Sequence, residues 1–420
     1  MRILTITPSL SIGGTERAAQ NFSVGYKQCG HEVVVLNHGR DGPRRKILES
    51  AEIRVETILS IRREALDDLN LGGFDVVHIH REGRRNDRET ALLDWAARHS
   101  RLIVETNVFF ARDYSVGEKY IDLHFHLAEI NQARWLKRGG AGASAVIPYP
   151  VDPMDFPIPL NEDVLRFRRS LGIPDEGFVF GRIGQPAAGK WDPIIISAFS
   201  KVAGRESENY LLLVGPSPEI VAQVSALDES VRRRIEVLDV IDSPEKLGIC
   251  YAAMNCFLHA ARQGESFGYV LAEALLHGVP VITVSRPHRD NAQTEVVRHG
   301  IDGLVVRSRS GVLQAMRSIM RNEDLRTKIQ NEGRMGVVER FGTEAVCGKA
   351  LNIFESILQW DVSPVCMVGK IQYDTIGVGD ASLRELMLAR FYDIGWVDFC
   401  IEGLRYRGRA IRNNLMGLRK

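Results

Sequence analysis

The chain has 420 residues, of which 45% are hydrophobic and 25% charged, the proportions of a soluble globular protein. Lys and Arg number 54 against 53 Asp and Glu, so the chain as a whole does not attract nucleic acid or a membrane by net charge. This length predicts two domains. Scattered cysteines without a Cys-x-x-Cys pair predict reduced thiols, and neither a signal peptide nor a membrane-spanning apolar run is evident. These features favour a cytoplasmic location.

The first forty residues predict a β-α-β unit with two glycines at its first turn. After a buried strand, a helix runs from Thr15, its expected N-terminal cap, to about Cys29, and Gly30 ends it before a second buried strand. Gly13 and Gly14 allow the backbone to approach a ligand. The pattern Gly-x-Gly-x-x-Gly is absent, which argues against a dinucleotide site. A plain tight turn is the alternative for the two glycines.

Two further buried strands are expected at 75–80 and 102–107. Arg81 opens a basic run that predicts a solvent-exposed start of a helix. The second strand ends in Asn107, whose amide can hydrogen-bond a hydroxyl but cannot take up its proton. Five prolines over 148–159 predict a stiff, irregular linker after the first domain.

The second half begins with a strand over 178–183 and a loop that ends at Lys190. Asp192 and Pro193 mark the start of the next helix. The loop satisfies the first part of the P-loop pattern, Gly-x4-Gly-Lys, but Trp191 stands where a Ser or Thr would bind Mg²⁺. This difference argues against a P-loop NTPase.

The most informative stretch runs over 263–282, where a glycine-bracketed turn leads into an apolar helix. Ser266 is the expected N-terminal cap of this helix, and Gly278 is its expected end. The helix contains one acid, Glu273, and a buried carboxylate costs several kcal/mol unless it has partners. A sugar diol offers two O–H donors, and a helix N-terminus attracts phosphate, so the stretch suits a sugar nucleotide. The alternative is a solvent-exposed Glu273 that pairs with His277.

This stretch resembles the paired-glutamate signature of the retaining glycosyltransferases of family four, which have the GT-B fold. The residues that match are Glu265, Phe267, Gly268, Glu273, Gly278, Pro280 and Val281. The loop at 13–17, Gly-Gly-Thr-Glu-Arg, also resembles the family, and the resemblance covers residues 1–360. It implies an α/β protein in which two Rossmann-like β/α/β domains face each other across a cleft. The implied parts are an acceptor-side domain (1–160), a nucleotide-sugar-binding domain (161–342), a helix that crosses back (343–360) and an extension of unknown role (361–420).

The resemblance also implies roles for single residues. Arg182 and Lys190 would neutralise the leaving diphosphate, although their spacing exceeds the one usual in the family, and Glu265 would contact the transferred sugar. The implied donor contacts are Gly13, Gly14, Ile241, His259, Gly264, Ser266, Phe267, Gly268 and, at the ribose, Glu273. A solvated Lys190 and a purely structural His259 are the alternatives. Asn107 stands where the family often has a histidine, which leaves a general-base role in question.

These features together predict a glycosyltransferase that moves a sugar from a nucleotide-diphosphate sugar to an acceptor hydroxyl. The family implies retention of configuration. The sequence has no Asp-x-Asp and no His/Cys ligand cluster, so no metal and no separate cofactor are expected. A UDP-sugar is the favoured donor, and a glycan, a lipid-linked or a small-molecule acceptor is expected, but no nucleic acid.

Two other classes remain open. A nucleotide-sugar epimerase or phosphorylase with the same fold would need no acceptor alcohol, and a non-catalytic protein would bind the nucleotide sugar without turning it over. The last residues, 400–420, form a basic amphipathic pattern that suits peripheral contact with the inner face of an anionic membrane. Contact of this segment with the second domain is the alternative.

Overall fold

A computed structural model describes residues 1–203 and 208–360 of the chain. The amphipathic pattern at 400–420 and the rest of the extension lie outside the described residues. The described chain divides into two compact units, residues 1–154 with 337–360 (unit 1) and residues 155–336 (unit 2). Among the described residues, no helix has both the length and the apolar character needed to cross a membrane.

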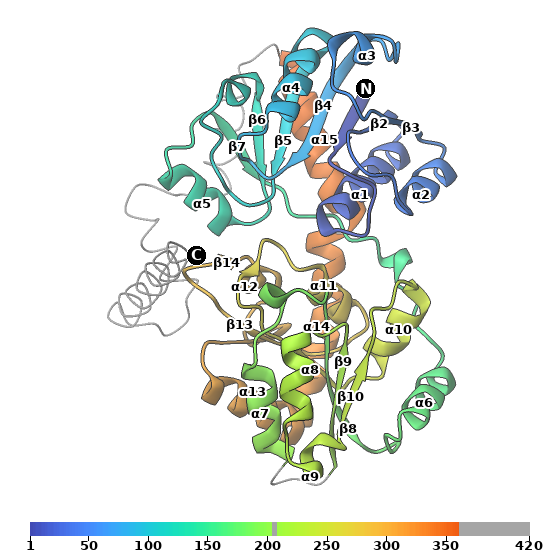
Figure 1. Cartoon of the computed structure of the whole chain (residues 1–420), viewed down its shortest axis with the longest axis vertical. Helices are drawn as coiled ribbons and strands as arrows, with labels where there is room; N and C mark the ends of the chain where they lie inside the picture. The colour runs from blue at the N-terminus through green and yellow to red at the C-terminus, as the bar shows by residue number, and fades with distance from the viewer. Residues whose placement is uncertain (204–207, 361–420) are drawn as a thin grey trace. The chain divides into compact units, whose positions relative to one another are not determined.

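Unit 1 is built on a parallel sheet of seven strands in the order β3-β2-β1-β4-β5-β6-β7 (Figure 1). The strands are β1 (Arg2–Thr7), β2 (Glu32–Asn37), β3 (Arg54–Thr57), β4 (Phe74–Arg81), β5 (Ser100–Asn107), β6 (Leu123–His126) and β7 (Ala143–Val146). Most of them are runs of buried residues, as expected for a parallel sheet covered on both faces. The strand order reverses between β1 and β4, and loops at the carboxyl ends beside such a reversal commonly bind ligands.

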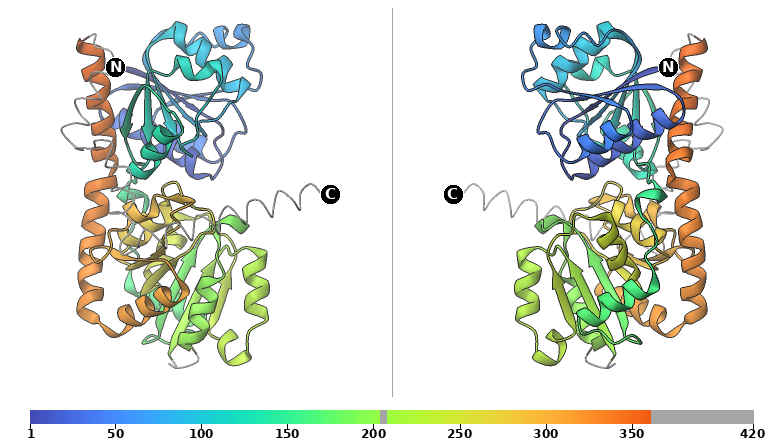
Figure 2. Two further views of the ribbon diagram at one scale, coloured as in Figure 1. Left: turned by 90° about the vertical axis from the view of Figure 1, so that its left-hand side faces the viewer. Right: turned by 90° about the vertical axis from the view of Figure 1, so that its right-hand side faces the viewer.

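Helices cover both faces of this sheet. They are α1 (Gly14–Gln28), α2 (Arg44–Ser50), α3 (Arg63–Asp67), α4 (Asp87–His99), α5 (Glu129–Lys137) and α15 (Thr343–Trp360), with 3₁₀ turns η1 (Val116–Tyr120) and η2 (Pro153–Asp155). On one face α15 lies along the sheet beside α1 (Figure 2). The ring of Phe354 on α15 is 5.9 Å from the ring of Tyr26 and 5.8 Å from that of Phe125. The expected capping by Thr15 is wrong, because α1 begins at Gly14 and the N-cap is Gly13, without a side-chain bond.

Arg81 also differs from the sequence prediction, because it is buried rather than exposed. Its Nε lies 3.0 Å from Glu89 and 3.4 Å from Glu105, and its Nη2 lies 2.5 Å from Asp113. The helix begins only at Asp87, so Arg81 belongs to β4 and points into unit 1. Burial raises the pKa of Glu89 to about 7, even though the charge of Arg81 acts in the opposite direction.

Unit 2 has a parallel sheet of six strands in the order β10-β9-β8-β11-β13-β15, with a reversal between β8 and β11. The strands are β8 (Phe178–Ile183), β9 (Asn209–Val214), β10 (Ile235–Leu238), β11 (Cys256–His259), β13 (Val281–Val284) and β15 (Gly303–Val306). A separate parallel pair is formed by β12 (Gly264–Glu265) and β14 (Asp290–Asn291). The loop that carries Lys190 follows β8, and the turn that carries Glu265 follows β11.

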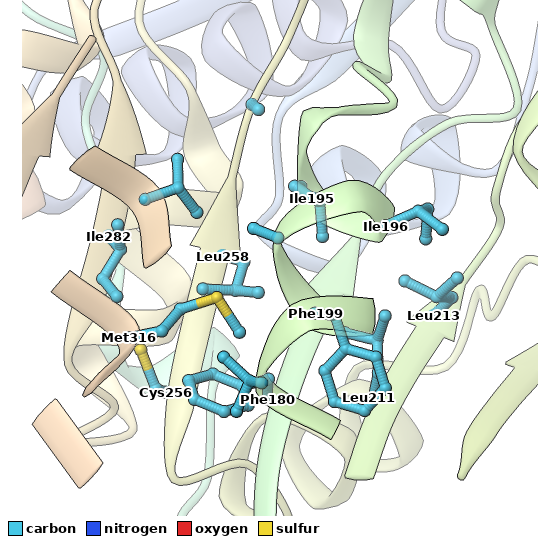
Figure 3. Close-up of a cluster of buried hydrophobic side chains, with 14 of the residues drawn as sticks. Phe180, Ile195, Ile196, Phe199, Leu211, Leu213, Cys256, Leu258, Ile282 and Met316 are labelled. Atoms are coloured by element: carbon cyan, nitrogen blue, oxygen red, sulfur yellow. The ribbon is translucent and has the colours of Figure 1, made fainter. Parts of the chain in front are cut away.

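The helices of unit 2 again cover both faces of its sheet. They are α6 (Asn161–Ser170), α7 (Ile194–Ala203), α8 (Pro218–Ser225), α9 (Glu229–Arg232), α10 (Pro244–Ala252), α11 (Tyr269–Leu276), α12 (Gln293–Val296), α13 (Arg309–Arg321) and α14 (Glu323–Phe341), with the 3₁₀ turn η3 (Ala188–Lys190). Figure 3 shows α7 and α13 packed on one face, where Phe199 and Met316 meet Phe180 of β8. On the other face Tyr251 of α10 lies 5.7 Å from Phe257. The chain returns to unit 1 at Val337, within α14.

Candidate active site

The carboxyl ends of β8 and β11 bring together two charged residues that are 75 positions apart in the sequence. The Nζ atom of Lys190 lies 2.5 Å from Oε2 of Glu265, and Oε1 of Glu265 lies 3.3 Å from Nε2 of His259. Glu265 is 5% exposed. Burial by itself would raise the pKa of Glu265, but the bond to His259 and the charge of Lys190 outweigh it and lower that pKa to about 2. Glu265 is therefore an ionised carboxylate at neutral pH.

His259 is held in place by the strand next to its own. Its Nδ1 lies 3.0 Å from the hydroxyl of Thr283, the residue paired with it on β13. Burial, followed by the charge of Arg182, lowers the pKa of His259 to about 4, so the imidazole is neutral at pH 7. Because the carboxylate of Glu265 can only accept, Nε2 carries the proton and Nδ1 accepts from Thr283. His259 thus has a structural partner and also faces the charged pair.

Arg182 lies on β8 directly beneath the loop of Lys190. Its Nη2 donates to the backbone carbonyl of Lys190 at 2.9 Å, and its guanidinium lies 5.3 Å from the ring of Trp191. Burial lowers the pKa of Arg182 to about 10, which leaves it charged at neutral pH. Within the described part of the chain, its Nε and Nη1 donate no hydrogen bond. The N–H groups of Nε and Nη1 therefore have no acceptor among the described residues, and the guanidinium places a positive charge beside Lys190.

The turn from Gly264 to Gly268 has a backbone that only glycine adopts easily. Gly264 has φ of 72° and Gly268 has φ of 99°. A Cβ at Gly264 would lie 1.5 Å from the carbonyl oxygen of Asp290, the residue opposite it in the β12–β14 pair. The expected capping by Ser266 is wrong, because α11 begins three residues later and Gly268 is its N-cap. Phe267 is 1% exposed, so its side chain is part of the core behind the turn.

Glu273 lies in α11 and is 4% exposed, which contradicts the alternative of a solvent-exposed pair with His277. The hydroxyl of Tyr251 donates to Oε2 of Glu273 at 2.6 Å. The Nδ1 atom of His277 instead lies 2.8 Å from the backbone carbonyl of Glu273, and its ring stacks on Tyr251. The carboxylate points inward because the neighbouring residues of α11 on both sides of Glu273 are apolar and buried, so this part of the helix lies inside unit 2. Gly278, with φ of 69°, ends the helix as expected.

Two of the remaining candidates differ in how exposed they are. Ile241 lies in the loop between β10 and α10, where it is half-buried next to Val240, which is 50% exposed. Asn107, at the end of β5 in unit 1, is buried, and its Nδ2 donates to the carbonyl of Ala111 at 2.8 Å. The side-chain amide of Asn107 therefore stabilises the loop that follows β5.

Gly13 and Gly14 lie at the junction of the first loop and α1 in unit 1. Arg44 holds this loop from below: its Nε donates to the carbonyl of Ser11 at 2.8 Å, and its Nη1 donates to Gln20 at 2.8 Å. Its Nη2 also lies 3.4 Å from the carbonyl of Gly13. The guanidinium of Arg44 thus binds the carbonyls of Ser11 and Gly13 and places a positive charge next to this loop.

Sequence reasoning missed several side chains that contact the predicted residues, among them Tyr251, Thr283 and Gln293. Only Thr283 had a usable signal, because two adjacent parallel strands place it beside His259. Tyr251 is 22 positions from Glu273 and on a different helix, so no local spacing predicts the contact. The described residues contain no group of three or more His, Cys, Asp or Glu arranged to hold a metal ion.

Residues 178–322 match the family model described as "Glycosyl transferases group 1". These residues form a glycosyl transferases group 1 domain. The match covers most of unit 2, including the Lys190 loop, the Glu265 turn and α11. It therefore covers every candidate residue of unit 2 that the sequence predicted.

Similar proteins match more of the chain than the family model does. The N-acetyl-alpha-D-glucosaminyl L-malate synthase of Bacillus anthracis is 26% identical over 211 residues, which are 50% of this chain and 53% of that protein. This chain thus matches about half the length of that relative. An uncharacterised glycosyltransferase of Methanocaldococcus jannaschii is 21% identical over 394 residues, which cover 86% of this chain and 99% of that protein.

The solved structure of HepE from Anabaena in complex with UDP and glucose resembles this chain with a TM-score of 0.69. The match has 18% sequence identity and covers 85% of this chain and all of HepE. Each of the two units has a parallel sheet with helices on its faces, and the chain resembles HepE over most of its length. The chain therefore has the GT-B fold.

Proposed function

We propose that this chain is a glycosyltransferase that moves a hexose from a nucleotide-diphosphate sugar to an acceptor hydroxyl with retention of configuration. The observation that carries the proposal is the Lys190–Glu265–His259 cluster within the group 1 domain. A buried carboxylate beside one lysine and one neutral histidine suits a substrate on which positive charge develops next to a departing anion.

The donor's diphosphate is bound by cations in this proposal. Arg182 provides the N–H groups of Nε and Nη1, which bond no other described residue, and Lys190 provides an ammonium on a side chain that is 29% exposed. The Gly13 and Gly14 amides would add donors from unit 1. Glu273, oriented by Tyr251, would accept the two hydroxyls of the ribose, because each carboxylate oxygen accepts more than one bond. A UDP-sugar is the favoured donor, supported by the UDP and glucose bound to HepE.

The chemical step breaks the bond between the anomeric carbon and the diphosphate oxygen, and the bonding electrons leave with the diphosphate. The acceptor oxygen forms the new bond to the anomeric carbon, and its proton passes to the leaving phosphate. A phosphate is needed as the base in this proposal because the amide of Asn107 cannot take up a proton and is bonded to Ala111. Arg182 and Lys190 stabilise the charge that builds on the diphosphate, and Glu265 stabilises the positive anomeric carbon.

Three further features belong to this proposal. The cations replace a divalent metal ion, the acceptor is a glycan, a lipid-linked or a small molecule, and no separate cofactor takes part. The protein would act in the cytoplasm, with peripheral contact to the inner face of a membrane through residues 400–420.

The test begins with a thermal-shift screen against UDP, GDP and ADP and their glucose conjugates. Since a ligand that binds only the folded state raises stability by mass action, the preferred nucleotide gives the largest shift. Incubation of that donor with candidate acceptors should give free nucleotide and a product of unchanged anomeric configuration. Conversion of the donor without any alcohol would indicate an epimerase or a phosphorylase. Binding without turnover, even with a broad set of acceptors, would indicate a binding protein.

A further inference from the structure

The segment from Ser285 to Gln293, here called the brace, follows β13 in unit 2 and contacts both loops of the candidate site. It includes β14, which pairs with the Glu265 turn: Gly264 lies opposite Asp290, and Glu265 lies opposite Asn291. The backbone N–H of Ala292 also donates to the carbonyl of Glu265 at 3.0 Å.

Gln293 connects the brace to Glu265 through its side chain. Its Oε1 accepts the backbone N–H of Glu265 at 3.1 Å. Its Nε2 donates to the carbonyl of Val284, at the end of β13, at 3.1 Å, and to Oδ1 of Asn291 at 3.1 Å. Gln293 is fully buried, so water cannot replace a hydrogen-bond partner that is lost by mutation. Glu265 is thus fixed at its main chain as well as at its carboxylate.

Arg286 connects the other end of the brace to the Lys190 loop. Its Nη2 pairs with the carboxylate of Asp192, two positions after Lys190, and its Nε lies 3.4 Å from the carbonyl of Ala261. Asp192 in turn accepts the N–H of Ile194 at the start of α7. The loop from β8 to Lys190 is long and contains two glycines, so without such an anchor it has many conformations to sample.

We propose that Gln293 and Arg286 are positioning residues that hold Glu265 and Lys190 at contact distance, an inference that rests on the proposed function. Neither side chain needs to touch the substrate, because each acts on a loop that carries a site residue. Loss of the Gln293 bond would free Glu265, and loss of the Arg286 pair would free the loop of Lys190. In the proposed function both groups must contact the same donor. Small misplacements of a reacting group can cost about 10²-fold in rate while leaving binding nearly intact.

The variants are Gln293→Met, which keeps the length of the side chain, and Arg286→Gln, which removes the charge. Controls match them within unit 2. Asn255→Leu removes the acceptor for the N–H of Val179 (2.8 Å) and for Arg168 (3.0 Å), and Arg298→Gln breaks the pair with Asp302 (2.6 Å). Asn255 precedes β11, whereas the site follows it, so that control acts at the opposite edge of the sheet.

Each variant is measured for kcat and KM of UDP release from UDP-glucose, for the Kd of UDP and for Tm. We expect kcat to fall at least about tenfold in Gln293→Met and Arg286→Gln, with the Kd of UDP within about threefold of the wild type. The double variant should lose less than the product of the single losses, because both act on one pair. The controls should lower Tm but retain kcat within about twofold.

Equal loss of kcat in a variant and its control at the same loss of Tm would overturn the inference, since the role would then be general stability. Hydrogen exchange provides a readout without turnover. The peptide over 262–268 should exchange faster in Gln293→Met than in Asn255→Leu, and unchanged exchange would also overturn the inference. If the wild type exchanges as expected but never turns over a nucleotide sugar, the proposed function fails and the positional role of Gln293 stands on the exchange result.

Discussion

Glu265 and Glu273 are both buried acids of one loop–helix stretch, but their partners differ in kind. Glu265 contacts the ammonium of Lys190 and the imidazole of His259, so its charge is balanced by groups of the protein. Glu273 accepts a bond from the neutral hydroxyl of Tyr251. A hydroxyl donates to a carboxylate without itself carrying a charge, and a carboxylate oxygen can accept more than one bond. The two acids are therefore expected to do different work.

Replacement of the two acids should separate binding from catalysis. Glu273→Gln should weaken UDP and UDP-glucose by similar amounts, about 1.5–3 kcal/mol, because the ribose is common to both and the lost bonds are charge-assisted. Glu265→Gln should lower kcat more than UDP affinity, because its contact strengthens as the anomeric carbon becomes positive. Calorimetry gives the Kd values and steady-state kinetics gives kcat. Wild-type affinity for UDP in Glu273→Gln would show that the ribose assignment is wrong. Tyr251→Phe, which keeps the carboxylate, should show a smaller loss.

Cationic side chains should make a divalent metal ion unnecessary. Arg182 and Lys190 both remain charged partners for a diphosphate in the proposal, so turnover should persist in excess EDTA. The measurement is nucleotide release with and without EDTA after dialysis. Complete loss of turnover that Mn²⁺ restores would contradict this expectation.

The β12 turn and α11 show how one element depends on another that is distant in sequence. The turn can pair with β14 only because Gly264 has no side chain: a Cβ there would meet the carbonyl of Asp290. Gly278, at the other end of α11, also has a positive φ, but a Cβ there would meet no atom within 4 Å. The two glycines therefore have the same conformational need and different steric surroundings.

This difference predicts unequal effects of the same substitution. Gly278→Ala should cost only the left-handed conformation, about 1 kcal/mol of unfolding free energy. Gly264→Ala should cost several times more and should also lower kcat, because backbone atoms of the β12–β14 pair must move apart. Urea unfolding and turnover of the two variants give the comparison. Equal unfolding free energies of the two variants would mean that the turn at Gly264 can separate from β14 without loss of stability.

Local signals predicted many elements of the fold but not the contacts between them. Buried apolar runs predicted β1, β2, β4, β5 and β8. Gly30 and Gly278 ended their helices as expected, because glycine takes the left-handed conformation that other residues avoid. Thr15 and Ser266 failed as caps, since glycines occupy those N-cap positions and capping preference alone cannot place a helix start. The prediction for Arg81 was wrong because its acidic partners Glu89, Glu105 and Asp113 come from three other segments. The sequence did not predict the contact of Lys190 with Glu265, because the family resemblance implied only a separate role for each residue.

The C-terminal segment 400–420, which lies outside the described residues, allows a separate test. If its basic amphipathic pattern contacts membranes, its deletion should abolish binding to vesicles that contain phosphatidylglycerol and leave donor hydrolysis intact. Binding of the full chain should also weaken as salt rises, because the attraction is screened. Sedimentation with vesicles measures both effects. Equal sedimentation of the full and truncated chains would favour contact of the segment with the protein itself.

At the scale of the whole molecule, both units follow one construction rule, a parallel sheet with helices on both faces. The family model covers the core of unit 2, whereas unit 1 is assigned by the fold alone. Unit 1 is also distinguished by its buried imidazoles. His38, His78, His80 and His126 are all buried there, and burial lowers the pKa of each, to about 4 for His38 and about 3 for His80. Among the described residues of unit 2, burial lowers the pKa of His259 to about 4 and also lowers that of the half-buried His277.

These histidines predict that unit 1 loses stability in mild acid. In the unfolded chain each imidazole takes up a proton near pH 6.5, whereas in the folded chain it stays neutral until the pH is far lower. Between those values the unfolded state binds more protons, so the free energy of unfolding falls as the pH falls, by about 1.4 kcal/mol per pH unit for each histidine. Glu89 acts with the opposite sign between about pH 7 and its unfolded pKa, because the folded state holds the extra proton there. It offsets one of the four histidines.

Urea unfolding at pH 7.5, 6.5 and 5.5 measures this slope. We expect the transition of unit 1 to move to lower urea between pH 6.5 and 5.5. It should move more than the transition of unit 2, where His259 and His277 are the corresponding groups. His80→Asn should reduce the slope of unit 1 by about one proton, and Glu89→Gln should steepen it, since it removes the group that opposes the histidines. Because these are differences in slope, they are separate from any loss of stability that the substitutions cause at pH 7.5. An unchanged slope in both variants would show that these groups titrate alike in the folded and unfolded chain.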